Sequence, residues 1–374
     1  QTRDMSARDI TTIIHQNNPI IDKSVRNDFT KTLDSFRITK QTQQVIPLDL
    51  LKKLLPKVDD DNYVLIVGDP SGSCCSYVIE HLGVPPSNVW VWEDHPTHKF
   101  LIQSISSEIN ILKNIEDYRM DKSKTYCIGN PPYSSEDRND NQKEWKKHLF
   151  SAMSRAKTTS FVVPASVISP SIHFNEIKPH LSYILTDVKK YFPKTASTFV
   201  VITVEDSIQD QCLIETKDDT FEIVLKDIQF LPNNITRENI EYLQKTLKGG
   251  REWKSNSVYP SSINYRHQWE DPEGKIEVLH TNNKSFFTDK ESSLNKEIRV
   301  AVTKSGEPNF QVVQNKGLTE CMIYTDGFDT LDEAQKYCDF CNSEVIQKAL
   351  SLSKFSGWTT RTVINNIPNI LDEE

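Results

Sequence analysis

Three short turns carry side chains that could do chemistry, and each turn follows an apolar run typical of a buried strand. Asp69 opens "DPSGS", Glu93 ends "NVWVWE", and Asn130 begins "NPPY". Pro131 and Pro132 each lack an N–H and have a fixed φ, so the chain must leave its strand in a stiff, extended turn. Such a turn holds the Asn130 amide oxygen and the Pro131 carbonyl at fixed positions, where both can accept hydrogen bonds.

Two fixed acceptors suit an exocyclic amino group, because each can bind one of its two protons. This grip draws the nitrogen out of planar conjugation and directs its lone pair at an electrophilic carbon, without a strong base. Tyr133 offers a face on which a flat base or amide can stack. The pattern therefore predicts group transfer to an amino nitrogen; the alternative is a strand-ending Pro-Pro turn without chemical consequence.

The two acids restrict the group donor. Asp69 favours a ligand with an ammonium group, and Glu93 stands where a carboxylate commonly accepts both hydroxyls of a ribose. Ser71 and Gly72 are small enough for backbone N–H groups to approach a ligand closely. GK[ST] and GxGxxG are both missing, which disfavours a phosphate cradle and a dinucleotide. A ligand with ribose and ammonium but no phosphate is S-adenosylmethionine.

A sheet of parallel strands would bring these turns together. Apolar runs alternate with helical patterns, which predicts an α/β, Rossmann-like, doubly wound and mostly parallel sheet. Ligands of such sheets bind beyond the carboxyl ends of the strands, where all three turns lie. "CLIETKDDTFEIVL" then predicts a hairpin, and one amphipathic helix is expected over residues 331–353.

Composition sets the broad class. The 374 residues suffice for two domains, and 37% hydrophobic with 26% charged residues is typical of a soluble globular protein. No apolar run reaches the length of a membrane span and the N-terminus is not a signal peptide, so we expect a cytoplasmic protein. We expect no metal site: Cys338 and Cys341 are interpreted as packed thiols, and His95 and His98 as loop histidines.

Local basic clusters stand out against a net charge of −8. They lie in the C-terminal part of the chain, among aromatic residues, and would be needed to hold a nucleic acid on an acidic protein. For each basic cluster taken alone, a solvent-exposed helix face is a sufficient explanation. The candidate DNA-binding residues are Lys245, Lys248, Arg251, Lys254, Lys354 and Arg361.

In their order, "DPSG", Glu93, "NPPY" and "YFPKTASTFVVITVE" resemble the motifs of amino-group DNA methyltransferases, in particular the N6-adenine type of the gamma arrangement. The resemblance covers about residues 45–205, and "FDTLDEAQKYCDF" with the final "NNIPNI" is similar to the end of that family's recognition domain. It implies a seven-stranded methyltransferase sheet and a C-terminal mixed α/β target-recognition domain. The expected division is an N-terminal helical arm at 1–44, an S-adenosylmethionine-dependent domain at 45–228 and a DNA target-recognition domain at 229–374.

The resemblance also assigns roles. The adenine must leave the DNA helix, because N6 is unreachable inside the base stack. The groups that grip and sandwich it would be Asn130, Pro131, Pro132, Tyr133 and Phe192. The cofactor contacts would be Pro47, Asp69, Pro70, Ser71, Gly72, Glu93 and Asn114. The sequence departs from the family's pattern at Cys74 and Cys75, where glycine is expected, and at Asn114, where the family has an acid.

The resulting hypothesis is a site-specific DNA adenine-N6 methyltransferase that uses S-adenosylmethionine and binds double-stranded DNA. It would act in a bacterial or phage-infected cell as a monomer or weak dimer. The sequence leaves open whether a cognate restriction enzyme is its partner. Cytosine-N4 is an alternative target, because the same grip serves any exocyclic amine. RNA or protein-glutamine methylation with the same "NPPY" chemistry, and a DNA-binding module that has lost catalysis, also remain alternatives.

Overall fold

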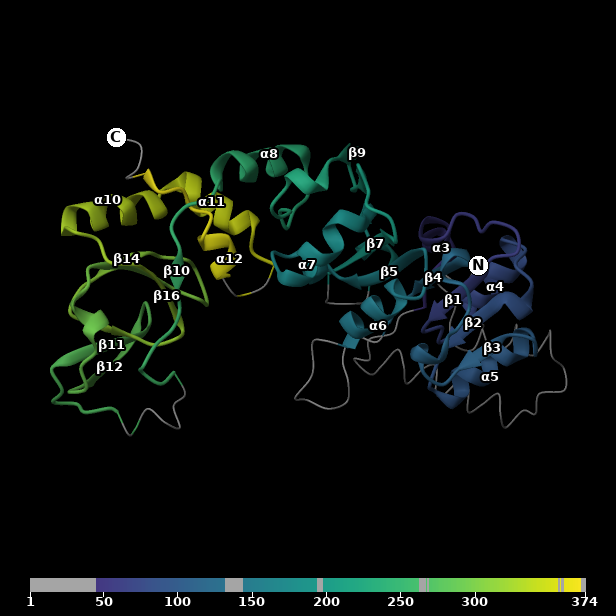
Figure 1. Cartoon of the computed structure of the whole chain (residues 1–374), viewed down its shortest axis with the longest axis horizontal. Coiled ribbons are helices and arrows are strands. Elements are labelled where there is room, and N and C mark those ends of the chain that lie inside the picture. Colours follow the sequence, from purple (N-terminus) through teal and green to yellow (C-terminus); the bar gives the residue numbers. More distant parts are fainter. Residues whose placement is uncertain are drawn as a thin grey trace. The chain divides into compact units, whose positions relative to one another are not determined.

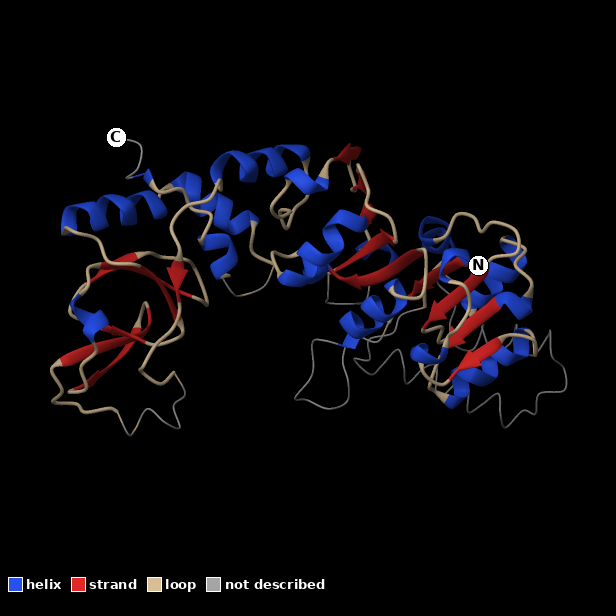
Figure 2. Cartoon of the chain, viewed as in Figure 1, coloured by secondary structure: helices blue, strands red, loops and turns tan. Residues whose placement is uncertain are grey.

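The computed structural model describes residues 45–131, 144–193, 198–261, 267, 269–355, 357 and 360–370 (Figures 1 and 2). The chain divides into two compact units, which are treated separately. The sheet unit comprises the described residues up to Ala165 together with Ile177–Leu225. The C-terminal unit comprises Ser166–Glu176 and the residues from Lys226 onward. The expected arm at 1–44 lies outside the described residues, and the roles assigned to the three predicted domains stay predictions.

The sheet unit is built on one nine-stranded sheet of order β3-β2-β1-β4-β5-β7-β6-β8-β9. The strands β1 to β6 and β8 pair in parallel wherever they adjoin one another, whereas β7 and β9 run antiparallel to their neighbours. The predicted doubly wound, mostly parallel sheet and its hairpin are confirmed. The hairpin joins the sheet edge, which gives nine strands instead of seven. The strands are β1 Tyr63–Val67, β2 Val89–Trp92, β3 Asn110–Leu112, β4 Thr125–Gly129, β5 Thr158–Pro164, β6 Leu181–Leu185, β7 Phe199–Glu205, β8 Cys212–Glu215 and β9 Thr220–Ile223.

Helices cover both faces of this sheet, which is why its strands read as near-continuous apolar runs. Val64 and Ile66 of β1 pack in one core cluster with residues of α3 and α4. Leu65 points to the opposite face and is equally buried. The helices of the sheet unit are α3 Leu48–Leu54, α4 Ser73–Ser76, α5 Pro96–Ile105 and α6 Glu144–Met153, and α4 continues as a π-helical turn, Tyr77–His81.

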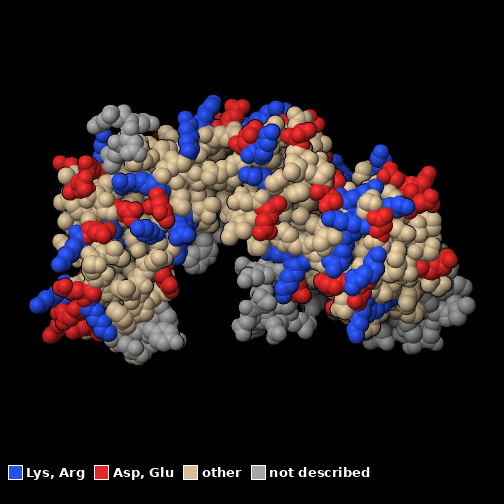
Figure 3. All heavy atoms as spheres, in the orientation of Figure 1, with Lys and Arg blue, Asp and Glu red and all other residues tan. Residues whose placement is uncertain are grey.

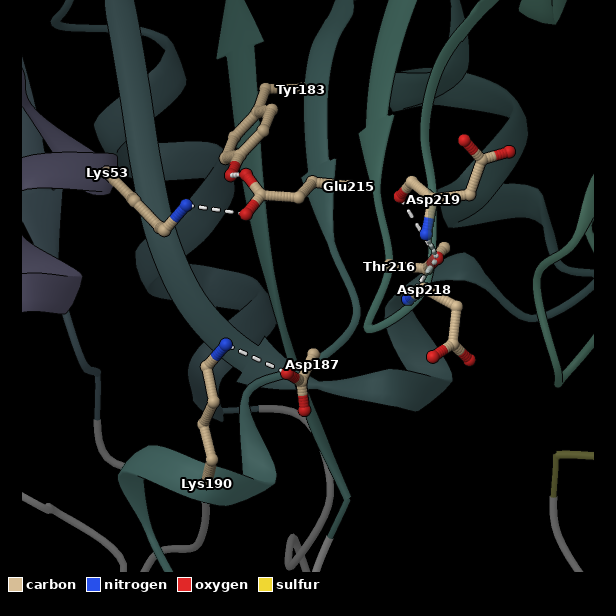
Figure 4. A network of polar contacts seen from close by, with 8 residues as sticks. All are labelled: Lys53, Tyr183, Asp187, Lys190, Glu215, Thr216, Asp218 and Asp219. Carbon is tan, nitrogen blue, oxygen red and sulfur yellow. Dashed lines mark hydrogen bonds and ion pairs between the residues drawn. The ribbon is translucent and has the colours of Figure 1, made fainter.

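Polar contacts tie α3 to the neighbouring strands β6 and β8 (Figure 4). Lys53 of α3 donates to Glu215 of β8 at 2.5 Å, and the Tyr183 hydroxyl of β6 donates to the same carboxylate at 2.6 Å. Lys190 pairs with Asp187 nearby at 2.8 Å. The hairpin that extends the sheet therefore also helps to anchor the helix that begins after Pro47.

The register of the parallel strands aligns their carboxyl ends. Val67 at the end of β1 lies opposite both Trp92 at the end of β2 and Gly129 at the end of β4. Trp92 in turn lies opposite Leu112, the last residue of β3. The turns that follow these four strands therefore begin at the same edge of the sheet.

The C-terminal unit contains a four-stranded sheet, β10-β16-β13-β14, and a three-stranded sheet, β12-β11-β15. Helix α10 packs against β13 and β14 (Figure 1). The strands are β10 Trp253–Lys254, β11 Ile276–Thr281, β12 Lys284–Thr288, β13 Arg299–Thr303, β14 Gln311–Val313, β15 Gly317–Leu318 and β16 Met322–Thr325. The helices are α7 Ile172–Ile177, α8 Arg237–Thr246, α10 Leu331–Cys341, α11 Glu344–Leu352 and α12 Arg361–Ile364.

The single helix expected over 331–353 is wrong, because the chain breaks it into α10 and α11. The Asn342 amide donates to the Phe310 carbonyl and accepts from the Phe310 N–H, and the Ser343 hydroxyl caps α11. Cys338 and Cys341 are buried in α10, and burial raises the pKa of Cys338 to about 11. The interpretation of these two residues as packed thiols is confirmed.

Within the described residues, no helix is long and apolar enough to cross a membrane. Within the same ranges, no group of three or more His, Cys, Asp or Glu side chains could hold a metal ion.

Candidate active site

Asn130 begins the stiff corner at the end of β4. Its N–H donates to the Val67 carbonyl at 3.2 Å, which extends the β1–β4 pairing by one residue. The residue is 1% exposed, and Pro131 after it is also buried. Pro132 and Tyr133 lie outside the described residues. The backbone that carries the first two predicted acceptors is therefore fixed by the sheet itself.

Gly129 is a requirement of this corner that sequence reasoning missed. A Cβ atom at this position would lie 2.3 Å from the Val67 carbonyl oxygen and 3.0 Å from the Val67 Cβ. Only glycine therefore lets β4 lie this close to β1 just before Asn130. The available signal was the glycine at the end of the apolar run in "CIGNPPY".

Asp69 is fully buried and binds the backbone of the helix that follows it. Its Oδ1 accepts from the Cys74 N–H at 3.1 Å and its Oδ2 from the Cys75 N–H at 3.0 Å. Burial raises the pKa of Asp69 more than these two hydrogen bonds lower it. The carboxylate caps the start of α4, and any ligand ammonium would use its remaining lone pairs.

The same contacts explain why cysteines can stand where glycine was expected. The turn needs its left-handed residue at Gly72, where φ is +72° and a Cβ would lie 2.7 Å from the Ile105 Cδ1. Cys74 and Cys75 already lie in helical backbone, and their side chains are buried. Burial raises the pKa of both thiols well above the ordinary value. Pro70 and Ser71 complete the turn and are also buried.

Glu93 is 1% exposed and joins the first turn to the second. Its Oε2 accepts from the Asp69 N–H at 3.3 Å, and its Oε1 accepts from the His95 N–H at 3.1 Å. His98 Nδ1 lies 3.2 Å from the same Oε1. Burial alone would raise the pKa of Glu93, but the nearby His98 imidazole, helped by the two N–H groups, lowers it. The site therefore favours the ionised carboxylate.

The interpretation of His98 as a loop histidine is wrong. Residue 98 lies in the first turn of α5 and is fully buried, with its Nδ1 3.2 Å from the Oε1 of Glu93, the residue after β2. His95 precedes the helix, and the two imidazole rings lie 4.4 Å apart between centroids. A histidine five residues after a strand-ending acid, in a helix that opens with Pro96, was the only signal in the sequence.

Asn114 lies beyond the end of β3, at the same edge of the sheet. It caps a short 3-10 helix, Ile115–Asp117, and is exposed. Its side chain accepts from the Asp117 backbone, while its own N–H and its amide donate to the Asp117 Oδ2 at 3.3 Å each. An amide oxygen keeps a second lone pair, so Asn114 can still accept from a ligand amino group.

Pro47 and Phe192 both belong to the buried interior of the sheet unit. Pro47 is buried, and its carbonyl accepts from the Leu50 and Leu51 N–H groups of α3 at 3.0 Å each. The Ser73 hydroxyl donates to the Ile46 carbonyl at 3.5 Å, which links this segment to the first turn. Phe192 is 5% exposed and packs edge-to-face on Phe199 at 6.1 Å. Its ring therefore lies in the core in this conformation.

The candidate DNA-binding residues differ in how far their charge is engaged. Lys254 pairs with Asp326 at 2.6 Å, Lys245 lies 3.9 Å from Glu241, and the Lys354 amine donates to a backbone carbonyl. The Arg251 guanidinium packs over the Phe328 ring at 4.0 Å. Lys248 and Arg361 are exposed. Acidic and basic side chains are interspersed over the face drawn in Figure 3.

Comparison with known proteins gives structural likenesses only. No family model matches the chain, and no curated protein sequence matches it. One similar solved structure is the type IIG restriction endonuclease BpuSI, with a TM-score of 0.45 and 11% identity over 95% of this chain and 64% of that one. A second is the type IIL restriction-modification enzyme MmeI in complex with DNA, with a TM-score of 0.43 and 10% identity over 89% of this chain and 63% of that one.

A third is the type I restriction-modification system methyltransferase subunit from Streptococcus thermophilus. It has a TM-score of 0.39 and 14% identity over 61% of this chain and 59% of that one. The chain thus spans less than two thirds of the length of each of these three proteins. With such scores and identities, the likenesses do not establish a shared family.

Proposed function

We propose that this protein is an S-adenosylmethionine-dependent DNA methyltransferase that acts on N6 of an adenine turned out of the duplex. One observation carries the proposal. The register of β1, β2 and β4 brings the Asp69–Glu93 pair and the Asn130 corner to one edge of a parallel sheet. Ligands of such sheets bind beyond this edge.

The donor side rests on Glu93 and on the turn at Asp69. A buried carboxylate that is held ionised is a strong acceptor for ribose hydroxyls. Asp69 orders the turn by capping α4, and the remaining lone pairs of its carboxyl oxygens can accept from an ammonium group. When bound, S-adenosylmethionine supplies a methyl group activated by the adjacent sulfonium.

The acceptor side rests on the "NPPY" corner. The Asn130 amide oxygen and the Pro131 carbonyl accept the two N6 protons and turn the nitrogen lone pair toward the methyl carbon. The nitrogen forms a bond to this carbon as sulfur leaves with its electron pair, and the extra proton passes to water. Tyr133 and Phe192 would hold the base between them, which requires Phe192 to turn out of its contact with Phe199.

The C-terminal unit would read the DNA sequence. Its candidate contacts are the basic residues named above, and its partner is double-stranded DNA. Asparagine at the first position of the motif favours adenine over cytosine by resemblance. An RNA or glutamine acceptor is less well supported, because a glutamine enzyme needs no separate unit after the sheet.

Incubation of unmethylated genomic DNA with the purified chain and labelled S-adenosylmethionine tests the proposal. Nucleoside analysis should find the label in N6-methyladenine, and modification-aware sequencing should place it in one sequence context. Label in 4-methylcytosine, in RNA or in a protein acceptor supplied in parallel would refute the adenine assignment.

Asn130→Ala tests the catalytic role directly. We expect methyl transfer to fall by at least about a hundredfold, the size of effect seen when a fixed transition-state contact is removed. Cofactor binding, measured by calorimetry, should change little because Asn130 holds the acceptor. Asn309→Ala, at an exposed asparagine of the C-terminal unit, is the matched control. A fully active Asn130→Ala enzyme would rule out the assigned role.

A further inference from the structure

Arg299 is a buried cation without a matching carboxylate. It is the first residue of β13 in the C-terminal unit and is 2% exposed. Its guanidinium forms no ion pair with any acid in the part of the chain that the structure describes. Burial lowers the pKa of Arg299, as expected for a cation that has lost its hydration without full compensation. Such a charge is costly to bury and would gain from an anionic partner.

Contacts within the chain hold the guanidinium in place but use few of its N–H donors. Its Nη2 donates to the Lys316 carbonyl at 3.1 Å, and its central carbon lies 4.9 Å from the centroid of the Tyr324 ring. The Tyr324 hydroxyl donates to the Asn256 carbonyl at 2.6 Å, which fixes the ring in turn. The Nε–H of Arg299 is buried and makes no hydrogen bond to any described residue. The side chain is therefore held rigidly with a buried donor still available.

The same arginine lines a small hollow in the C-terminal unit. The hollow has a volume of about 10 Å³, which is room for one water molecule or for one oxygen atom of a larger group. Among the described residues that line it, none is acidic. Ser292 also lines it, and its hydroxyl makes no hydrogen bond to the described residues. Asn256 and Val258 belong to the lining and are exposed, so the hollow reaches the surface.

We propose that this hollow, formed around Arg299 and Ser292, binds one non-bridging oxygen of a DNA backbone phosphate. The inference rests on the proposed function, because it takes the C-terminal unit as the part that contacts DNA. A base edge lies inside a groove, which a guanidinium buried in the protein cannot enter, whereas phosphate oxygens project from the surface of the duplex. The Arg299 Nε–H and the Ser292 hydroxyl then donate to the same anionic oxygen.

Ser292→Asp tests the site without removing the arginine, since it places a carboxylate in the hollow. This carboxylate should pair with Arg299 and keep or raise the thermal stability of the full chain. Binding of labelled duplex DNA, measured by fluorescence anisotropy, should weaken by about tenfold or more, as expected for loss of charge-assisted hydrogen bonds. The slope of log affinity against log salt concentration should become shallower by about 0.9, the contribution of one phosphate contact.

Ser293→Asp is the matched control, because Ser293 is the next residue and is exposed. It adds the same charge outside the hollow, where salt screens it, and should change the affinity for DNA by less than about threefold. Equal losses in the two variants would show general repulsion and overturn the inference. Wild-type DNA affinity in Ser292→Asp would overturn it as well.

Two further variants separate the charge from the hydroxyl. Arg299→Met removes the charge and should give the same shallower slope as Ser292→Asp. Ser292→Ala should weaken binding by about two- to tenfold with an unchanged slope, since it removes one neutral donor. A purely structural role for Arg299 would lower stability without changing the slope, so a folded Arg299→Met protein with the wild-type slope contradicts the proposal. If Arg299→Met does not fold, the comparison of Ser292→Asp with Ser293→Asp still decides.

Inorganic phosphate distinguishes a free anion from the DNA backbone as the source of the oxygen. At constant ionic strength, it could raise the unfolding temperature of wild type but not of Ser292→Asp while both proteins bind DNA equally. That result would assign the hollow to a free anion and refute the DNA contact. If wild type binds duplex DNA and every variant keeps its slope, the proposed function survives and only this inference fails. If wild type binds no duplex DNA at any salt concentration, with or without S-adenosylmethionine, both fail.

Discussion

Asp69 and Glu93 are joined through the Asp69 N–H, and their buried carboxyl groups show opposite shifts in pKa. The pKa of Asp69 is raised because burial outweighs its two backbone donors. The pKa of Glu93 is lowered because an imidazole and two backbone N–H groups together outweigh burial. A carboxylate that must accept from hydroxyls benefits from the second arrangement, since only the ionised form accepts with both oxygens.

Glu93 should therefore make stability depend on pH in the acid range. The pKa of Glu93 in the folded chain lies below the ordinary value of 4.5. Its contribution to the free energy of unfolding is therefore complete above pH 4.5 and is lost as the pH falls through its pKa in the folded chain. At neutral pH we expect Glu93→Gln to reduce the free energy of unfolding by about 1.5–3 kcal/mol, the range for hydrogen bonds to charged groups.

Chemical denaturation of both proteins between neutral pH and pH of about 3 measures this difference. The difference in unfolding free energy between wild type and Glu93→Gln should narrow as the pH falls below the ordinary carboxyl pKa of 4.5. Glu80→Gln is the control, because Glu80 is exposed. A gap that stays constant with pH would show that the variant acts through packing and not through the charge.

At the scale of elements, the pairing of β1 with β4 decides where the Asn130 corner lies. This pairing tolerates only glycine before the corner, because the clash at residue 129 is with the backbone oxygen of Val67 and not with a flexible side chain. The corner and the glycine before it therefore form one structural unit.

Gly129→Ala should weaken this unit strongly. We expect a loss of at least about 3 kcal/mol in unfolding free energy, the upper end for overpacking, because backbone must move. Hydrogen exchange should speed up at the amides of β1 and β4 in particular. Gly327→Ala is the matched control, since its Cβ would meet only ordinary contacts at 3.5 Å. Equal effects of the two substitutions would argue against the close approach of the strands.

The sequence predicted those features that depend on local pattern. Apolar runs identified the strands, and the turns after them identified Asp69, Glu93 and Asn130, since strand ends in a parallel sheet share one edge. The sequence could not predict contacts that depend on helix packing, such as His98 against Glu93. Nor could it predict that β8 and β9 extend the sheet, or that Asn342 ends α10, because each depends on a partner distant along the chain.

At the scale of the whole molecule, charge distribution governs any encounter with DNA. The chain carries a net charge of −8, so its average field repels a polyanion. Binding must then come from a few cations whose charge is not already neutralised by neighbouring acids. The candidate DNA-binding residues fall into two groups. Lys254 forms an ion pair with Asp326 at 2.6 Å, whereas Lys248 and Arg361 are exposed to solvent.

This division predicts which substitutions change the salt dependence of DNA binding. Each phosphate contact contributes about −0.9 to the slope of log affinity against log salt concentration. We expect Lys248→Gln and Arg361→Gln each to make the slope shallower by about this amount, and Lys254→Gln to change it less because Asp326 already neutralises that amine. Lys217→Gln, at the exposed turn of the β8–β9 hairpin, is the control. Fluorescence anisotropy with labelled duplex DNA over a salt series measures the slopes. An unchanged slope in both Lys248→Gln and Arg361→Gln would exclude these residues from the phosphate contacts.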